Sequence, residues 1–238
     1  LEWCKKKSYR FITLQECYAI LSGKIRQEGK VAYLSFDDGW QSNLNLIPII
    51  DKYQAPITIF VSIDPLLSGN FWWEYALADG IELRNKMKLM SYKKFVSSLE
   101  SLKKKYSLER SVLTEQELVK IASHPLVSIQ SHTMSHPILT NCDDEILSYE
   151  LNSSKAYLEN LLHHKIEAFS YPNGNFSNRE IEAVKKAGYK MAFTTEYIPI
   201  QINHTNLYRI PRMAMNTYGG YYENLSKILG IWQDILKK

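Results

Sequence analysis

Short apolar segments of strand length alternate with helical patterns along most of this 238-residue chain. Several of these segments are apolar without alternation, which is typical of strands in a parallel sheet that is covered on both faces. Parallel strands need a crossover between them, and helices usually supply it. We therefore predict an α/β fold built from βαβ units. The predicted strands span residues 31–36, 56–63, 126–130, 166–171, 190–194 and 206–210.

Helix signals lie between these strands. Capping boxes, in which Ser or Thr is followed three residues later by Glu, predict two helix starts. Leucines at helical spacing predict a long helix over residues 147–162. Pro48 lies in the first crossover and is compatible with a helix only in its first turn. The capping pairs are Thr114 with Glu117 and Ser177 with Glu180.

Residues 64–125 interrupt the alternation of strands and helices. They contain Phe71-Trp72-Trp73-Glu74 and then further helical patterns. The segment is roughly ten times longer than the usual connection of 2–6 residues, and such insertions are often functional. The total length suits one α/β barrel domain. We predict a single domain over residues 1–238 with a helical insertion after the second strand.

Bulk composition excludes several classes of protein. With 45% hydrophobic and 23% charged residues, the chain is neither disordered nor fibrous. The net charge of +4 comes largely from lysine clusters at 5–7 and 103–105. No nucleic-acid-binding motif accompanies them, so no nucleic-acid partner is expected. No apolar run approaches the roughly 18 residues of a membrane span, so no transmembrane segment is predicted in this chain.

The cysteines Cys4, Cys17 and Cys142 are odd in number and lack Cys-x-x-Cys spacing. They predict no disulfide framework, which favours a cytoplasmic location. The chain begins at Leu1 rather than Met, which we interpret as truncation of the N-terminus. A periplasmic or cell-surface location stays open if an N-terminal signal is missing.

Two adjacent carboxylates, Asp37 and Asp38, follow the first predicted strand in the segment Ser-Phe-Asp-Asp-Gly-Trp. Neighbouring residues on a regular strand point to opposite faces. Both carboxylates can therefore reach one site only if the chain turns there, and Gly39 permits such a turn. An isolated Asp-Asp-Gly is equally consistent with an ordinary turn.

His132 and His136 follow the third predicted strand in the segment Ser-His-Thr-Met-Ser-His-Pro. A spacing of four places both imidazoles on one side of a single helical turn, where they can reach one ion. A histidine pair alone is also compatible with a face that binds nothing. With Asp38 it forms a three-ligand set that leaves coordination positions open, as a catalytic metal requires. We predict a divalent ion, Zn²⁺ first, with Co²⁺, Ni²⁺ or Mn²⁺ as alternatives.

Two later segments also end predicted strands. The first is Tyr171-Pro172-Asn173-Gly174, and the second carries Arg209 and Arg212. Each is weak by itself, because the first resembles a turn and the second resembles surface charge. In parallel α/β barrels, however, the loops after the strands build the active site. All four segments are therefore predicted to share one site.

These motifs resemble those of the polysaccharide deacetylases, the NodB-like group of carbohydrate esterase family 4, from about Val31 to Arg212. The resemblance implies a distorted (β/α) barrel with fewer than eight regular units. It implies that Asp37 is the catalytic base, that Asp38, His132 and His136 bind the metal, and that the backbone N–H of Tyr171 holds the oxyanion. The opening strand of relatives is expected to be absent before Trp3. Trp72-Trp73-Glu74 and Arg-Ile-Pro-Arg are similar to a subgroup associated with surface polysaccharide or lipopolysaccharide.

The sequence departs from the family pattern at the general acid. Relatives have a histidine near the end of the domain, and His204 is the nearest candidate here. Arg209 and Arg212 cannot donate a proton at neutral pH because guanidinium stays charged. We expect them to orient Asp37 or bind substrate.

Three tryptophans are candidate surfaces for stacking on sugar rings, although large aromatic residues are more often part of a core. They are Trp40, Trp72 and Trp73.

The predicted function is metal-dependent removal of an N-acetyl group from an amino sugar of a polysaccharide or lipopolysaccharide. An N-acetylated glycan is therefore the expected partner. Two alternatives remain open. One is hydrolysis of an O-acetyl ester or a cyclic imide by the same centre, and the other is a catalytically silent glycan-binding protein.

Overall fold

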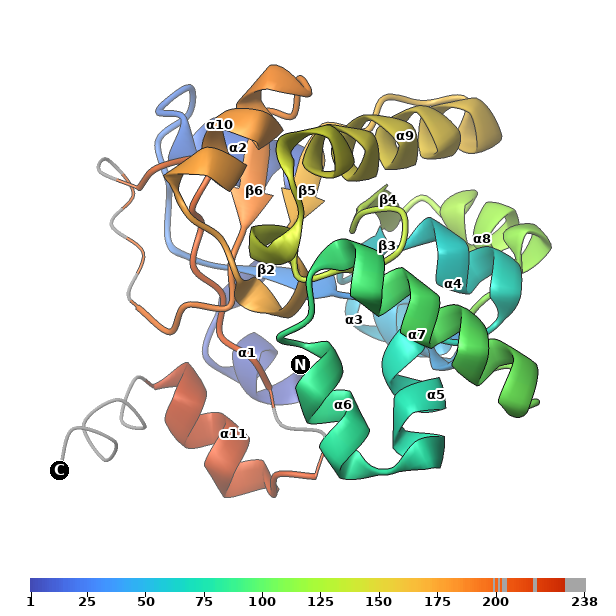
Figure 1. Ribbon diagram of the computed structural model, residues 1–238. Coiled ribbons are helices and arrows are strands. Elements are labelled where there is room, and N and C mark those ends of the chain that lie inside the picture. Colours follow the sequence, from blue (N-terminus) through green and yellow to red (C-terminus); the bar gives the residue numbers. More distant parts are fainter. Residues whose placement is uncertain (199, 201, 203–204, 216–217, 230–238) are drawn as a thin grey trace, which may run out of the picture.

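The computed structural model describes residues 1–198, 200, 202, 205–215 and 218–229. Within these residues the centre of the fold is a six-stranded sheet whose strands follow chain order, β1-β2-β3-β4-β5-β6, all parallel (Figure 1). The sheet curves into a half-barrel surrounded by helices, which confirms the predicted distorted α/β barrel. The strands are β1 (Tyr9–Ile12), β2 (Lys30–Phe36), β3 (Ile57–Val61), β4 (Val127–Ser131), β5 (Ala168–Ser170) and β6 (Met191–Phe193).

Helices connect consecutive strands, as a parallel sheet requires. No helix among the described residues combines the length and apolar character needed to cross a membrane. The α-helices are α1 (Glu2–Lys6), α2 (Leu14–Leu21), α3 (Ile47–Tyr53), α4 (Ile63–Ser68), α5 (Trp72–Asp79), α6 (Ile81–Met87), α7 (Tyr92–Lys105), α8 (Glu115–Ala122), α9 (Asp144–Leu162), α10 (Asn178–Lys186) and α11 (Tyr221–Ile228). Short 3₁₀ helices span η1 (Gln41–Leu46), η2 (Leu139–Asn141) and η3 (Pro172–Gly174).

The predicted helix starts match the structure. Thr114 and Ser177 accept hydrogen bonds from backbone N–H groups of α8 and α10, and both capping boxes are complete. Pro48 lies in the first turn of α3, where its missing N–H removes no helical bond. Leu147, Leu151 and Leu158 of α9 are buried against the sheet. Local sequence chemistry therefore agrees with the fold over most of the barrel.

One predicted strand is absent from the structure, and one observed strand was not predicted. Residues 206–210 form no strand, and only one bridge joins Ile210 to Phe193 of β6. The reason is a turn, because Asn206 accepts the N–H of Tyr208 through its side chain and the N–H of Arg209 through its carbonyl. Conversely, β1 was not predicted. It is four residues long and lies at the sheet edge, so its apolar signal is short.

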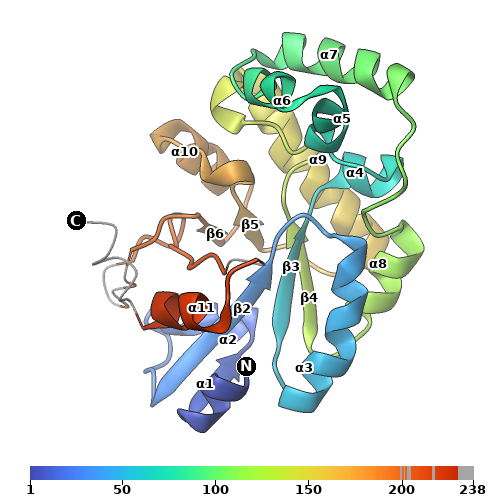
Figure 2. The same ribbon diagram turned by 90° about the horizontal axis from the view of Figure 1, so that it is seen from below.

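The predicted insertion consists of helices α4 to α8, between β3 and β4. Helices α5, α6 and α7 pack around a core of their own, separate from the main core. Figure 2 shows these three helices beyond the carboxyl ends of β3 and β4. The insertion therefore forms one wall over the end of the barrel where the strand-following loops meet.

Candidate metal centre

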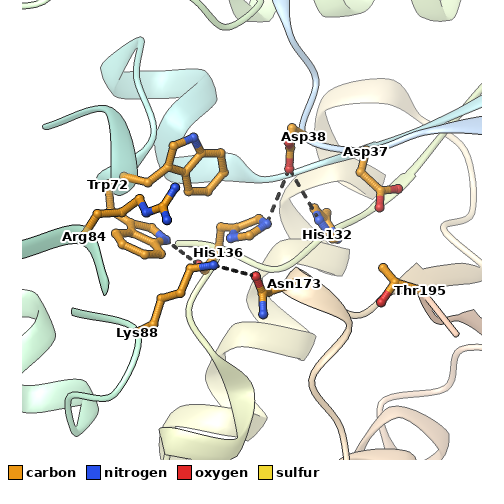
Figure 3. Close-up of a pocket in the computed structure, with 10 residues that line it drawn as sticks. Asp37, Asp38, Trp72, Arg84, Lys88, His132, His136, Asn173 and Thr195 are labelled. Carbon is orange, nitrogen blue, oxygen red and sulfur yellow. Dashed lines mark hydrogen bonds and ion pairs between the residues drawn. The ribbon is translucent and has the colours of Figure 1, made fainter. Parts of the chain in front are cut away.

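A cleft of about 330 Å³ lies at the carboxyl ends of the strands (Figure 3). Its size falls in the range of small-ligand sites. One side comes from the loops after β2, β4, β5 and β6, and the other comes from the insertion. The lining residues are Asp37, Asp38, Trp72, Trp73, Arg84, Lys88, His132, His136, Asn173 and Thr195.

Asp37 and Asp38 both reach the cleft because strand β2 ends just before them and the chain then turns. Strand β2 stops at Phe36, and Asp38 takes a left-handed backbone conformation with φ of 78°. Gly39 follows with φ of 87°. A pleated strand would send the two side chains to opposite faces, whereas this turn brings both carboxylates into the cleft. The predicted break in the pleat is confirmed.

The histidines lie on a loop rather than on the predicted helical turn. His132 continues the pairing of β4, because its N–H donates to the carbonyl of Val61 at 2.9 Å. Thr133 and His136 then adopt positive φ values of 75° and 54°. The Thr133 hydroxyl accepts the N–H of His136 at 3.0 Å and closes the loop. Two left-handed residues, not helical periodicity, bring the imidazoles together.

A buried carboxylate holds this loop in place. Glu150 of α9 is fully buried and accepts the backbone N–H groups of Met134 and Ser135 at 2.8 and 2.9 Å. The hydroxyls of Ser135 and Tyr92 also donate to it, at 2.6 and 3.2 Å. Burial raises the pKa of Glu150, and the bonds from Ser135 and Met134 oppose that rise. Glu150 therefore fixes the backbone between the two histidines.

Asp38, His132 and His136 form one convergent set of ligand atoms. The Asp38 Oδ1 lies 3.5 Å from His132 Nε2 and 3.4 Å from His136 Nε2. Ligands of a tetrahedral zinc ion are separated by about 3.3–3.6 Å, given metal–ligand bonds of about 2.0–2.2 Å. All three ligand atoms lie within 4.8 Å of one another. The spacing and the chemistry of these donors therefore fit a divalent cation.

The tautomer and the protonation state of His132 are those of a metal ligand. Its Nδ1–H donates a hydrogen bond to the carbonyl oxygen of Ser170 at 2.7 Å, which leaves Nε2 unprotonated and facing Asp38. Burial lowers the pKa of His132 to about 4, and the nearby Asp37 charge opposes this only in part. The imidazole is therefore neutral at physiological pH, as metal coordination requires.

Two of the three predicted sugar-stacking tryptophans instead support the ligands. The Trp40 indole N–H donates to Asp38 Oδ2 at 3.0 Å, and Trp40 does not line the cleft. The Trp72 indole N–H donates to the carbonyl of His136 at 3.0 Å, and its ring is buried in the insertion core. Trp73 lines the cleft and packs edge-on to His136. Trp72 and Trp73 both line the cleft, and Trp73 is the less buried of the two, so Trp73 is the better candidate for stacking on a sugar.

Asp37 is held by a guanidinium from the far end of the chain. Arg212 donates to both Asp37 carboxylate oxygens at 2.7 Å, and the Ser170 hydroxyl donates to one of them at 3.2 Å. Burial alone would raise the pKa of Asp37, but Arg212, with help from His132 and Ser170, lowers it to about 2. Asp37 is therefore ionised at neutral pH and fixed beside the ligand set.

The sequence profile of the polysaccharide deacetylase family matches residues 24–192, which is well over half of the chain. The chain belongs to this family. The Bacillus subtilis protein YxkH is 24% identical over 94% of the chain and 68% of its own length. The poly-β-1,6-N-acetyl-D-glucosamine N-deacetylase of Staphylococcus aureus is 25% identical over 91% of the chain and 64% of its own length. The chain thus spans about two thirds of these curated relatives.

Solved structures of the family share the fold. IcaB from Ammonifex degensii superposes with a TM-score of 0.64 at 16% identity, over 94% of this chain and 84% of that one. The polysaccharide deacetylase BC0361 from Bacillus cereus gives 0.67 at 19% identity, over 95% and 58%. The Streptococcus pyogenes deacetylase PplD in complex with acetate gives 0.58 at 23% identity, over 82% and 69%. At these identities the likeness shows the fold alone.

Three predicted site residues are placed differently or cannot be placed. The N–H of Tyr171 donates to the carbonyl of Phe193 at 3.1 Å, so it is not available to hold an oxyanion in this structure. Arg209 is exposed and pairs with Glu196, outside the cleft lining. Its predicted contact with substrate is not supported. His204, the candidate general acid, lies outside the described residues.

Several residues of the site were not predicted. Arg84 and Lys88 carry no motif, and only their place on the insertion brings them to the cleft. Thr195 follows β6 and also lines it. The role of Glu150 was not predicted either. A signal was present, because a Glu within the buried leucine stripe of a helix needs a buried hydrogen-bond partner.

Proposed function

We propose that this chain is a metal-dependent hydrolase that removes the N-acetyl group from an amino sugar of a polysaccharide or lipopolysaccharide. The observation that carries this proposal is the convergence of Asp38, His132 and His136 beside an ionised Asp37 in one open cleft. Zn²⁺ is the proposed ion, since two imidazoles and one carboxylate are ligands that zinc prefers.

Family relatives support the choice of an N-acetyl group. The Staphylococcus aureus relative acts on poly-β-1,6-N-acetyl-D-glucosamine by its name, and it is similar over 91% of this chain. N-acetylglucosamine within a glycan is therefore the first substrate to test. The sugar next to it and the linkage belong to the same test.

The geometry of the cleft supports the following proposed roles. A divalent cation in this set would supply Lewis acidity and lower the pKa of water, as such ions do in hydrolases. Asp37 is ionised and accepts a proton during attack on the acetamide carbon. Arg212 fixes the direction of both Asp37 oxygens, so the proton is accepted at a set position.

The leaving amine must gain a proton as the C–N bond breaks. No third histidine lines the cleft among the described residues. Asp37, protonated in the first step, is the group placed to return that proton to the nitrogen. Trp73 is proposed as the surface against which the pyranose ring packs.

The direct test is acetate release from tetra-N-acetylchitotetraose (chitotetraose below) compared with acetylated xylan, with added Zn²⁺. Release from chitotetraose that exceeds release from xylan supports N-deacetylation, and the reverse favours the O-acetyl esterase alternative. An Asp37→Asn variant should keep its metal and lose activity by about 10²–10⁴-fold, as expected for loss of a general base. Wild-type protein that binds metal and releases no acetate from any N-acetylated glycan would overturn the proposal.

A further inference from the structure

Two cations of the insertion face the cleft without acidic partners. Arg84 lies on α6 and Lys88 directly follows that helix, and both line the cleft with half-buried side chains. Their spacing of four places them on the same side of the helix. Arg84 donates to the side-chain oxygen of Asn85, and Lys88 donates to that of Asn173 at 3.0 Å. Both partners are neutral amides.

The acidic residues of the cleft are already engaged. Asp37 is paired with Arg212, and Asp38 belongs to the ligand set. Across the part of the chain that the structure describes, neither Arg84 nor Lys88 forms an ion pair. Their two positive charges therefore remain uncompensated next to a site that would also hold a divalent cation. Such a concentration of positive charge favours an anionic ligand.

The position of these cations identifies which part of a ligand they would meet. Figure 3 shows Arg84 and Lys88 on one side of His136, and Asp37 with Thr195 on the other side. The acetamide must lie near Asp37 and the ligand set. A negative group near Arg84 and Lys88 would then lie on another part of the same sugar or on a neighbouring sugar.

Hydrogen bonds to neutral groups position Arg84 and Lys88 at the cleft. The side chain of Asn141 donates to the carbonyl of Lys88 at 2.8 Å and fixes the chain where α6 ends. The bond from Lys88 to Asn173 joins the insertion to the loop after β5. Hydrogen bonds from a guanidinium or an ammonium to a carboxylate or phosphate are roughly twice as strong as neutral ones. A neutral amide partner positions each cation and leaves its charge available.

We propose that Arg84 and Lys88 form a subsite for an anionic group, so that the substrate is an acidic N-acetylated glycan carrying a carboxylate or a phosphate beside the N-acetyl sugar. This inference rests on the proposed function for the acetamide and adds the charge of its neighbour. The insertion thus selects the substrate, while the barrel loops carry out the reaction.

Matched substrates test the proposal directly. A hyaluronan tetrasaccharide carries uronate carboxylates beside N-acetylglucosamine, and the same tetrasaccharide with those carboxyl groups reduced to alcohols keeps size and linkage. We expect wild-type kcat/KM to be about tenfold higher for the acidic form at low ionic strength, as two charge-assisted bonds allow. High salt should diminish the difference.

The double variant R84Q/K88Q should lose this preference, mainly through a higher KM for the acidic form, so that its kcat/KM values for the two forms become about equal. Lys86 is the matched control, because it is exposed on α6 and does not line the cleft. K86Q should behave as wild type. Equal wild-type rates on the two tetrasaccharides, together with inhibition by N-acetylglucosamine 1-phosphate no stronger than by N-acetylglucosamine, would overturn the proposal. A preference that persists in R84Q/K88Q would also overturn it.

Binding separates failure of the subsite from failure of the proposed function. If no tetrasaccharide releases acetate, the function fails, and calorimetry of the two forms then decides the subsite. Tighter binding of the acidic form, lost in R84Q/K88Q, supports the subsite, and equal binding rules out a uronate as its anion. N-acetylglucosamine 1-phosphate tests a phosphate source. Inhibition by this phosphate stronger than by N-acetylglucosamine, combined with no preference for the uronate, would assign phosphate as the anion.

Discussion

Arg212 donates hydrogen bonds to both carboxylate oxygens of Asp37 at 2.7 Å, although the two residues are 175 positions apart in the chain. The same guanidinium also donates to the hydroxyls of Ser35 and Ser170, at 3.1 and 2.7 Å. The ends of β2 and β5 and the segment that carries Arg212 therefore meet at one group. A planar guanidinium can make this set of directed bonds, whereas an ammonium cannot.

Replacing Arg212 by Lys should lower kcat by about 10–100-fold with little change in KM. The charge beside Asp37 is kept, but the two-point contact that sets the direction of its oxygens is lost. Steady-state acetate release measures the effect. Arg209→Lys is the control, because Arg209 is an exposed arginine paired with Glu196. Equal kcat losses in the two variants would contradict the positioning role, and metal content should stay unchanged in both.

Replacing Glu150 by Gln should weaken metal binding by about 10–100-fold, as loss of an outer-shell partner typically does. A neutral amide has one acceptor oxygen in place of the two that hold the loop between His132 and His136. Competition with a chromogenic chelator measures the dissociation constant. Glu145→Gln, at an exposed position of the same helix, is the matched control. Unchanged affinity in Glu150→Gln would show that the loop holds its shape without this carboxylate.

Replacing Trp40 by Phe should weaken metal binding by about tenfold, because it removes the indole N–H that fixes Asp38 and keeps an aromatic ring in its place. The aromatic contact with Phe71 is largely kept, so the melting temperature should change little. Trp73→Phe is the comparison. Within the part of the chain that the structure describes, Trp73 forms no hydrogen bond with any of the three proposed metal ligands. That variant should retain metal affinity and raise KM for glycan. The reverse pattern would argue against these two assignments.

Thiol labelling of the folded protein should modify one cysteine quickly and leave two unmodified. Burial raises the pKa of the Cys17 thiol and that of the Cys142 thiol, each to about 12. The thiolate is the reactive form, so both buried thiols are almost inert near neutral pH. Cys4 is half-buried and should react. Mass spectrometry before and after denaturation gives the count, and fast labelling of Cys17 or Cys142 would conflict with this core.

The ligand set could be predicted from sequence because its residues follow two strands in a parallel sheet. Adjacent aspartates after β2 and paired histidines after β4 must meet at one end of the barrel. The predicted geometry of the histidine pair was wrong even so. Spacing suggested a helical turn, whereas left-handed conformations at Thr133 and His136 produce the contact. Backbone conformations of this kind depend on tertiary contacts such as those of Glu150.

Residues that act through the fold were harder to predict. Arg84 and Lys88 reach the cleft only because the insertion packs over the barrel, and no local motif records that packing. The N–H of Tyr171 was expected to be available, but pairing with Phe193 uses it. The prediction of a strand at 206–210 was wrong for a local reason, because the side chain of Asn206 stabilises a turn there. Sequence patterns therefore located the reacting groups better than the groups that position them.

Asp38, His132 and His136 are proposed to hold one catalytic divalent ion. Titration of chelator-treated protein with Zn²⁺, with acetate release from chitotetraose measured at each addition, tests for that ion. We expect activity to rise from near zero and to level off at one equivalent per chain. His132→Ala, checked for its fold by circular dichroism, should neither bind the ion tightly nor gain activity. Acetate release that is unaffected by the chelator, or that His132→Ala retains, would show that the reaction does not depend on an ion at these residues.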